Sequence, residues 1–231
     1  MSGEVEGLPF CSPHVMNVIK FEDDTEQIIP LVKDVIVRGG VMIGPTDTVY
    51  GIFGRADEEE VIKRMLDLKK SPEEKAFPIF VKDIKMARWY ACISDAKARL
   101  LQILWPGPIT AIFYHKEKLP PMLTGNSDSI GIRMPDHPLL IGLLAELMVP
   151  MAQTSANISE EPPARNAEEV FAYVESKQDK LDLFIDGGEV SGESSVVIDL
   201  RTSTPQILRT GLMSKDELDR LMQKMLEVLH A

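Results

Sequence analysis

The chain has 231 residues, of which 44% are hydrophobic and 26% are charged, a composition typical of a folded globular protein. Its formal net charge of −11 argues against extensive direct binding of nucleic acid, which requires Lys and Arg to displace counterions from the phosphates. No apolar run approaches the ~20 residues that cross a bilayer, and the first 17 residues carry no Lys or Arg, so we expect a cytoplasmic protein without a targeting peptide or a membrane contact.

The first predicted element is a helix that follows Asp24-Thr25, shows apolar residues at helical spacing and ends at Gly39-Gly40. A strand is predicted at residues 41–43. A second helix, with Asp57 as its N-cap, ends at Ser71-Pro72 because the residue before a proline avoids the helical region.

The remaining pattern alternates strands and helices. Strands are predicted at residues 79–81, 110–114, 129–134, 149–154, 183–185, 195–200 and 206–208, and helices at 84–91, 96–104, 138–147 and 166–176. A last helix starts at Ser214, with Glu217 in capping-box spacing, and carries a Leu and Met stripe that predicts a docking face. The fold class is therefore α/β, with one domain built on a twisted mixed sheet flanked by helices.

Two predicted strands end in polar turns. Thr46-Asp47-Thr48 follows the strand at 41–43 and Pro45, and Ser155-Ala156-Asn157 follows the strand at 149–154. Ligands of α/β sheets bind beyond strand ends, so the two turns can face one pocket. Ordinary strand-to-loop connections also use Ser, Thr, Asp and Asn, and each turn alone fits that alternative.

The chain contains neither a Gly-x-x-x-x-Gly-Lys-Ser/Thr loop nor a Gly-x-Gly-x-x-Gly fingerprint, so a nucleotide would need dispersed side chains. The candidate cations are Lys69, Lys70, Lys75, Arg133 and Arg209. The two arginines lie in strand-like segments, which predicts that they point inward and are partly buried. A buried guanidinium needs an anion, and for Arg133 this is either a ligand or a structural carboxylate such as Asp136.

Cysteine and histidine spacing predicts no metal site. Cys11 and Cys92 are too few for a disulfide framework, and the four histidines are scattered. We expect Cys92 to pack beneath a helix end rather than to act as a nucleophile.

Five segments, in the same order along the chain, resemble the YrdC-like threonylcarbamoyl-AMP synthases. They are 45–51, 69–78, 105–110 (Trp-Pro-Gly-Pro-Ile-Thr), 155–157 and 207–211. The resemblance covers residues 17–211 and implies a single YrdC-like domain with a concave pocket, preceded by an N-terminal extension at 1–16 and followed by a C-terminal helix at 212–231. It looks like the short, single-domain form of the family.

The resemblance implies an enzyme that forms threonylcarbamoyl-AMP and pyrophosphate from L-threonine, bicarbonate and ATP. Mg²⁺ would accompany ATP, and the partner would be a threonylcarbamoyl transferase that modifies tRNA. L-threonine would be bound by Thr48, Arg133 and Ser195, where Ser195 matches the serine that precedes a Val-Val strand in the family. ATP would be bound by Lys69, Lys70, Ser71, Lys75, Ser129, Ser155, Asn157 and Arg209, with Lys69 and Lys75 as the catalytic cations.

Two positions depart from the family pattern. The signature Lys-x-Arg-Pro stands here as Lys69-Lys70-Ser71-Pro72, and Phe80 matches a position where some members have histidine. Lys70 or Lys75 could supply the missing charge, although lysine cannot reproduce the bidentate fork of arginine. A YciO-type paralogue, or an RNA-binding YrdC-like protein without synthase activity, is therefore the alternative.

Overall fold

The structure is a computed structural model that describes residues 17–21, 25–72, 75–158, 161–175, 181–211 and 213–230. The N-terminal extension expected at 1–16 lies outside the described residues. No helix in the described part of the chain is long and apolar enough to cross a membrane.

The strands form one mixed sheet whose order is β1-β8-β2-β3-β7-β4-β6-β5-β9-β10. Neighbours are parallel in the pairs β1/β8, β2/β8, β4/β6 and β5/β9 and antiparallel in the others. The strands are β1 (Asn17–Lys20), β2 (Met42–Gly44), β3 (Gly51–Arg55), β4 (Ile79–Phe80), β5 (Ile109–Tyr114), β6 (Ser129–Arg133), β7 (Met151–Ser155), β8 (Leu183–Asp186), β9 (Val196–Asp199) and β10 (Gln206–Arg209).

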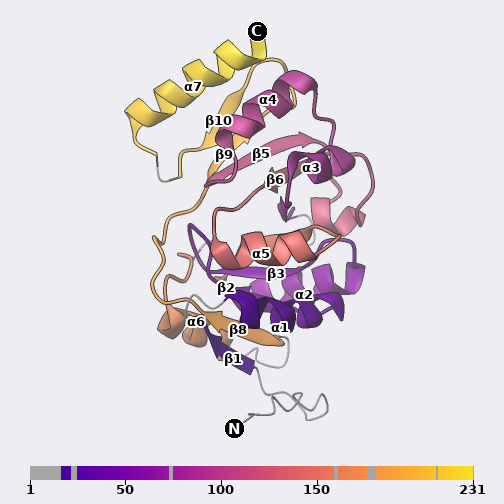
Figure 1. Ribbon diagram of the computed structural model, residues 1–231, viewed down its shortest axis with the longest axis vertical. Coiled ribbons are helices and arrows are strands. Elements are labelled where there is room, and N and C mark those ends of the chain that lie inside the picture. The colour runs from indigo at the N-terminus through magenta and orange to yellow at the C-terminus, as the bar shows by residue number, and fades with distance from the viewer. Residues whose placement is uncertain are drawn as a thin grey trace.

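The helices are α1 (Thr25–Val37), α2 (Glu59–Lys69), α3 (Ile84–Tyr90), α4 (Asp95–Leu104), α5 (Pro138–Glu146), α6 (Ala167–Val174) and α7 (Lys215–His230), with a 3-10 turn η1 at Pro121–Thr124. Figure 1 shows β1 at one end of the molecule and α7, beside α4, at the other. The predicted α/β class with a mixed sheet is confirmed.

Successive side chains of each strand point to opposite faces of the sheet, and each face has its own hydrophobic core. One face packs against α2, α3, α4, α6 and α7 in a continuous hydrophobic core. The other face carries a smaller core that contains Met42, Phe53, Phe80 and Met151 and is covered by α1 and α5, which pack against each other. Because successive strand residues point to opposite faces, residues 129, 131 and 133 of β6 share the face of this smaller core.

The smaller core ends beside Arg133. Phe80 pairs with Arg133 across β4 and β6, and its ring centroid lies 5.6 Å from the guanidinium carbon. Beyond this point the same face of β5, β6 and β9 carries Thr110, Gly131 and Val197, which line a cavity. The cavity is therefore the part of the sheet face that α1 and α5 leave uncovered.

Some sequence predictions of local structure are wrong. Glu58, not Asp57, is the N-cap of α2, and it makes no side-chain capping bond; Asp57 instead accepts hydrogen bonds from Arg55. Cys92 is exposed rather than packed beneath a helix, because it follows an isolated bridge at Ala91 on the rim of the sheet.

The capping box predicted at the start of the last helix is confirmed. The Ser214 backbone N–H donates to Glu217 Oε2 at 2.8 Å and the Glu217 N–H donates to Ser214 Oγ at 3.4 Å, which is a capping box. The Ser214 hydroxyl also donates to Glu217 Oε2 at 2.7 Å, and the hydrogen bonds from the Ser214 hydroxyl and backbone N–H lower the pKa of the Glu217 carboxyl below its usual value. Leu221 and Met225 are buried in the main core, where α7 packs on α4.

Candidate functional site

A cavity of about 330 Å³ lies on the uncovered part of the sheet face. Residues from eight segments of the chain line it: Thr48, Val49, Lys69, Lys75–Pro78, Thr110, Ile112, Ser129, Gly131, Arg133, Gln153–Ser155, Ser194, Ser195, Val197 and Arg209. It thus brings together Thr48, Lys69, Lys75, Ser129, Arg133, Ser155, Ser195 and Arg209 from the residues predicted by sequence. The two polar strand-end turns do meet at one pocket.

The turn after β2 is held by its own hydroxyl groups. Thr46 Oγ1 accepts the backbone N–H of Thr48 at 2.9 Å and that of Val49 at 3.0 Å, and it donates to the Val49 carbonyl at 2.7 Å. The Thr48 carbonyl accepts from Ser191 Oγ and from the Gly192 N–H. These bonds fix Thr48, which is 1% exposed, at the cavity wall.

Arg133 lines the cavity from β6, and its side chain is 3% exposed. Its Nη2 donates to Asp47 Oδ1 at 2.6 Å, its Nη1 to Thr48 Oγ1 at 3.1 Å and its Nε to the Gly107 carbonyl at 3.0 Å. Burial lowers the pKa of Arg133 below its ordinary value, and Asp47 opposes that shift. The structural carboxylate is therefore Asp47, and the expectation of Asp136 is wrong because Asp136 is exposed.

Arg209 faces the same cavity from the edge strand β10. Its Nε donates to the Ser195 carbonyl at 2.9 Å and its Nη2 to Ser195 Oγ at 3.1 Å. Ser195 Oγ is also 3.0 Å from Thr110 Oγ1, so the hydroxyl groups position the guanidinium. Arg209 is exposed as a whole residue, but its hydrogen bonds to Ser195 are partly buried, as predicted. The pKa of its guanidinium is lowered by desolvation and by the charge of Arg133.

Lys69 is the last residue of α2, lines the cavity and is 2% exposed. Its Nζ donates to the carbonyl of Ser155 at 2.7 Å, to Ser155 Oγ at 2.8 Å and to Asn157 Oδ1. Ser155 Oγ in turn donates to Asn157 Oδ1 at 2.7 Å, and Asn157 Nδ2 donates to the Glu161 carbonyl. The Lys69 ammonium is thus held rigidly by the turn after β7.

Three predicted ATP residues do not line this cavity. Lys70 has φ 49°, in the left-handed region, and it lines a neighbouring hollow of about 600 Å³ together with Asn157, Pro163, Arg165 and Tyr173. Asn157 still reaches the cavity through its contacts with Lys69 and Ser155. Ser71 lines neither space, and its backbone N–H donates to the Leu66 carbonyl. Of the two lysines proposed to cover for arginine, only Lys75 lines the cavity.

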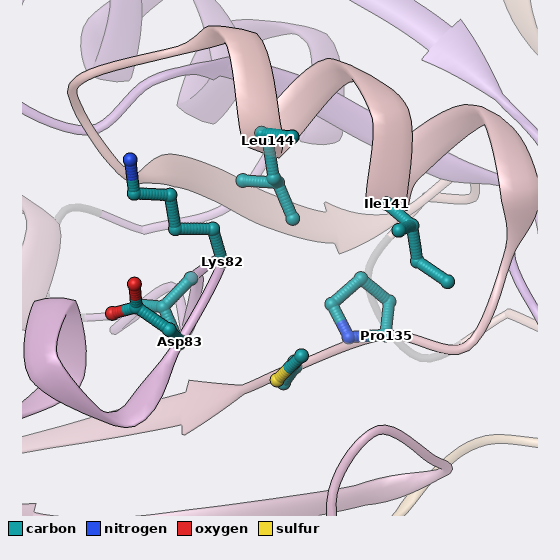
Figure 2. Close-up of a pocket in the computed structure, with 8 residues that line it drawn as sticks. Lys82, Asp83, Pro135, Ile141 and Leu144 are labelled. Atoms are coloured by element: carbon teal, nitrogen blue, oxygen red, sulfur yellow. The ribbon is translucent and has the colours of Figure 1, made fainter.

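A third hollow, of about 300 Å³, lies beside α5. Figure 2 shows Ile141 and Leu144 of α5 with Pro135 on one side of it and Lys82 and Asp83 on the other. Asp83 Oδ1 accepts the Met86 N–H at 2.6 Å and so caps α3. This mainly apolar space, with one charge of each sign, offers little to an anionic ligand.

Metal-binding groups do not gather in the described part of the chain, where no cluster of three or more His, Cys, Asp or Glu could hold an ion. The described residues that line the cavity include four cations and no carboxylate. A cation would reach this space only with an anionic ligand that brings its own oxygen atoms.

Sequence reasoning missed some of the site. Asp47 was identified only as a turn residue, although it is the ion-pair partner of Arg133. Thr110 and Gly131 also line the cavity, and an added Cβ at Gly131 would come within 3.2 Å of Pro78 Cβ. The alternation of β5 and β6 could have revealed both, since every second residue of a strand faces the same side.

The mixed sheet and its cationic cavity define an α/β protein with a cavity suited to an anionic ligand. The family described as "Telomere recombination" (Sua5/YciO/YrdC) matches residues 34–211, and the chain belongs to this family.

Curated relatives agree with that assignment. The threonylcarbamoyl-AMP synthase of Pyrococcus abyssi (strain GE5 / Orsay) is 32% identical over 188 residues, which are 80% of this chain and 54% of the relative. The threonylcarbamoyl-AMP synthase of Escherichia coli O6:H1 is 34% identical over 142 residues, 60% of this chain and 75% of the relative. The chain spans about half the length of the Pyrococcus abyssi relative and of a Bacillus subtilis one.

Solved structures share the fold. The crystal structure of P. abyssi Sua5 complexed with L-threonine is 29% identical with a TM-score of 0.81, covering 91% of this chain and 61% of that one. The crystal structure of E. coli YciO is 26% identical with a TM-score of 0.77, covering 87% and 97%. The predicted YrdC-like fold is confirmed.

Proposed function

We propose that this protein is an L-threonylcarbamoyladenylate synthase, which joins L-threonine, bicarbonate and ATP and releases pyrophosphate. The observation that carries the proposal is one cavity lined by four cations, Lys69, Lys75, Arg133 and Arg209, from separate segments of the chain. Arg133 and Arg209 approach from the sheet, and Lys69 approaches from the end of α2. Similarity to relatives named threonylcarbamoyl-AMP synthase and to a structure complexed with L-threonine supports the choice of substrates.

L-threonine is assigned to the Arg133 half of the cavity. The threonine carboxylate would accept hydrogen bonds from the guanidinium of Arg133, whose orientation is set by Asp47, Thr48 and Gly107. Thr48 and Ser195 also line the cavity and would offer hydroxyl groups to the amino acid.

ATP is assigned to the half that contains Lys69, Lys75, Ser155 and Arg209, with Ser129 also on the wall. In our proposal Lys69 and Lys75 neutralise the pyrophosphate that leaves, while Asn157 keeps Lys69 and Ser155 in place. Lys70 and Ser71 contribute less, since neither lines the cavity. Mg²⁺ would be bound by phosphate oxygens and water, because the described lining residues include no carboxylate.

The proposed chemistry has two steps. First, the threonine amine forms an N–C bond with CO₂ derived from bicarbonate and loses a proton, giving a carbamate and, overall, water. Second, a carbamate oxygen attacks the α-phosphorus of ATP, and the bond to the β-phosphate oxygen breaks as pyrophosphate leaves. The protein contributes by holding both reactants in line and by stabilising the charge on pyrophosphate, so no covalent enzyme intermediate is needed.

The product is a mixed anhydride that hydrolyses in water. We therefore propose that the protein works in the cytoplasm and hands the product directly to a transferase that modifies adenosine in tRNA. With a net charge of −11, we expect little direct contact between this protein and the tRNA.

The test is formation of AMP-linked product and pyrophosphate from ATP by the purified full chain, with L-threonine and bicarbonate added or omitted and serine as a substrate control. We expect pyrophosphate release that requires both threonine and bicarbonate. Lys69→Met tests the role of the lysine. It removes the ammonium that contacts Ser155 and Asn157, and turnover should fall by about 10²-fold or more. Threonine-independent release, or none from folded protein that binds ATP, would contradict the proposal.

The second candidate is a YciO-type activity on another small substrate. Ser71 in place of the family arginine favours it, as does the similarity to E. coli YciO over 97% of that chain. The same assay separates the two, because a YciO-type protein would bind nucleotide without threonine-dependent turnover. RNA retention that weakens steeply with salt would instead point to the RNA-binding alternative.

A further inference from the structure

The ion pair behind the cavity wall is nearly closed to solvent. Asp47 Oδ1 lies 2.6 Å from Arg133 Nη2, and the two side chains are 13% and 3% exposed respectively. The second oxygen, Asp47 Oδ2, is buried and has no hydrogen-bond partner. Burying a carboxylate oxygen without a partner is costly, so its retention calls for an explanation beyond simple packing.

Arg209 has a different electrostatic environment. Both of its hydrogen bonds go to neutral oxygens of Ser195, and no carboxylate of the described residues forms an ion pair with it. The charge of Arg133 lowers the pKa of Arg209, so the two guanidiniums act on each other across the same space. One arginine on this wall is therefore neutralised by a carboxylate, and the other is not.

We propose that Asp47 is a positioning residue that determines which ligand each half of the cavity accepts. By neutralising Arg133, it makes that half suited to a zwitterionic amino acid and unsuited to a polyphosphate. The inference rests on the proposed function, because it assumes that an amino acid and a nucleotide share the cavity.

The physical reason is the sign of the local field. A pyrophosphate group placed at Arg133 would meet one positive and one negative charge a few ångströms apart, whereas the hydrogen bonds that the structure gives for Arg209 go to neutral oxygens. A zwitterionic amino acid should have the opposite preference and bind beside Arg133. Its carboxylate can face the guanidinium while its ammonium is attracted by the carboxylate behind it, and low-dielectric walls strengthen both effects.

The experiment compares three probes by calorimetry on the full chain: L-threonine, 3-hydroxybutanoate, which is threonine without its amine, and pyrophosphate. Wild type should bind L-threonine at least about tenfold more tightly than 3-hydroxybutanoate. In Asp47→Asn, which keeps the shape and removes the charge, that ratio should collapse to about two or less, and pyrophosphate should bind more tightly than it does to wild type.

Two further variants make the result specific. Asp136→Asn removes the same charge three residues from Arg133, but Asp136 is exposed, so all three affinities should stay at wild-type values. Asp47→Glu keeps the charge and should retain the preference for threonine over 3-hydroxybutanoate. A residue that only supported the fold would change all three affinities together and would leave their ratios unchanged.

Wild-type ratios in a folded Asp47→Asn protein would overturn the inference while leaving the synthase proposal intact. If Asp47→Asn does not fold, equal binding of L-threonine and 3-hydroxybutanoate by wild type would overturn it as well. If wild type binds pyrophosphate but no L-threonine, the proposed function fails, and this inference fails with it.

Discussion

Arg133 and Arg209 line the same cavity yet are held in opposite ways. Arg133 is buried, ion-paired with Asp47 and bonded to Thr48 and to the turn at Gly107, so it belongs both to the fold and to the site. Arg209 is exposed on an edge strand, and the described residues give it hydrogen bonds to Ser195 only. The two arginines can thus bind different ligands. In our proposal Asp47, which forms an ion pair with Arg133, determines which ligand each arginine binds.

The difference also concerns stability. Removing one member of a buried pair leaves the other charge buried and unpaired, whereas removing an exposed arginine leaves only a solvated surface. The comparison therefore predicts a fold defect at Arg133 and a binding defect without a fold defect at Arg209.

The largest effect is expected for Arg133→Ala. Because Asp47 would stay buried without its partner, the free energy of unfolding should fall by about 3–5 kcal/mol, in addition to the loss of threonine binding. Urea denaturation measures the first effect and calorimetry with L-threonine the second.

The double variant Arg133→Met with Asp47→Asn removes both charges of the pair. It should recover part of the lost stability without recovering threonine binding, since the unpaired charge is gone but the guanidinium is still missing. A single variant Arg133→Ala that is as stable as wild type would show that the ion pair does not contribute to the fold.

The burial of Arg133 could be anticipated from sequence, but its partner could not. Residues 129–134 were predicted as a strand with Arg133 pointing inward, and β6 spans Ser129–Arg133 with Arg133 buried. Asp136 was the expected carboxylate because it is close in sequence, whereas Asp47 is 86 residues away and reaches Arg133 only because β4 and β7 place β3 and β6 in one sheet. Pairing of strands distant in sequence is not encoded in any local pattern.

Other parts of the fold also show which features the sequence patterns predict and which they miss. The helices with clear apolar periodicity, α1, α2, α4 and α7, were predicted close to their observed ends. The strands β1 and β3 were missed, and β3 reads Gly-Ile-Phe-Gly-Arg, with glycines that suggest a loop. The motifs identified Thr48, Lys69, Arg133 and Arg209, which line one cavity, whereas Lys70 has a left-handed backbone and lines a separate hollow. Such a conformation has no clear signal in a lysine.

A smaller effect is expected for Arg209→Gln. Stability should change by no more than about 0.5 kcal/mol, because the residue is exposed, while the KM for ATP should rise by about tenfold. The KM for threonine should change much less, since Arg133 remains in place. Steady-state kinetics with each substrate varied in turn measures the two values.

Arg220→Gln is the matched control for Arg209→Gln. Arg220 is an exposed arginine of α7 that lines no part of the cavity, so both KM values should equal those of wild type. Equal rises in the KM for ATP and for threonine in Arg209→Gln would contradict a cavity with two electrostatically distinct halves.

The smallest effect is expected for Ser71→Arg, which restores the family signature two residues after Lys69. A guanidinium on the Lys69 side should tighten ATP binding by about two- to fivefold, the range for a solvent-accessible charge, and should leave threonine binding unchanged. Nucleotide and threonine titrations of the variant measure this, with Ser71→Gln as an uncharged control of similar length. Gain of threonine-dependent turnover on top of tighter ATP binding would mean that the natural Ser71 limits the synthase reaction. Unchanged ATP affinity would mean that Lys75, which already lines the cavity, supplies the charge that the arginine provides elsewhere in the family.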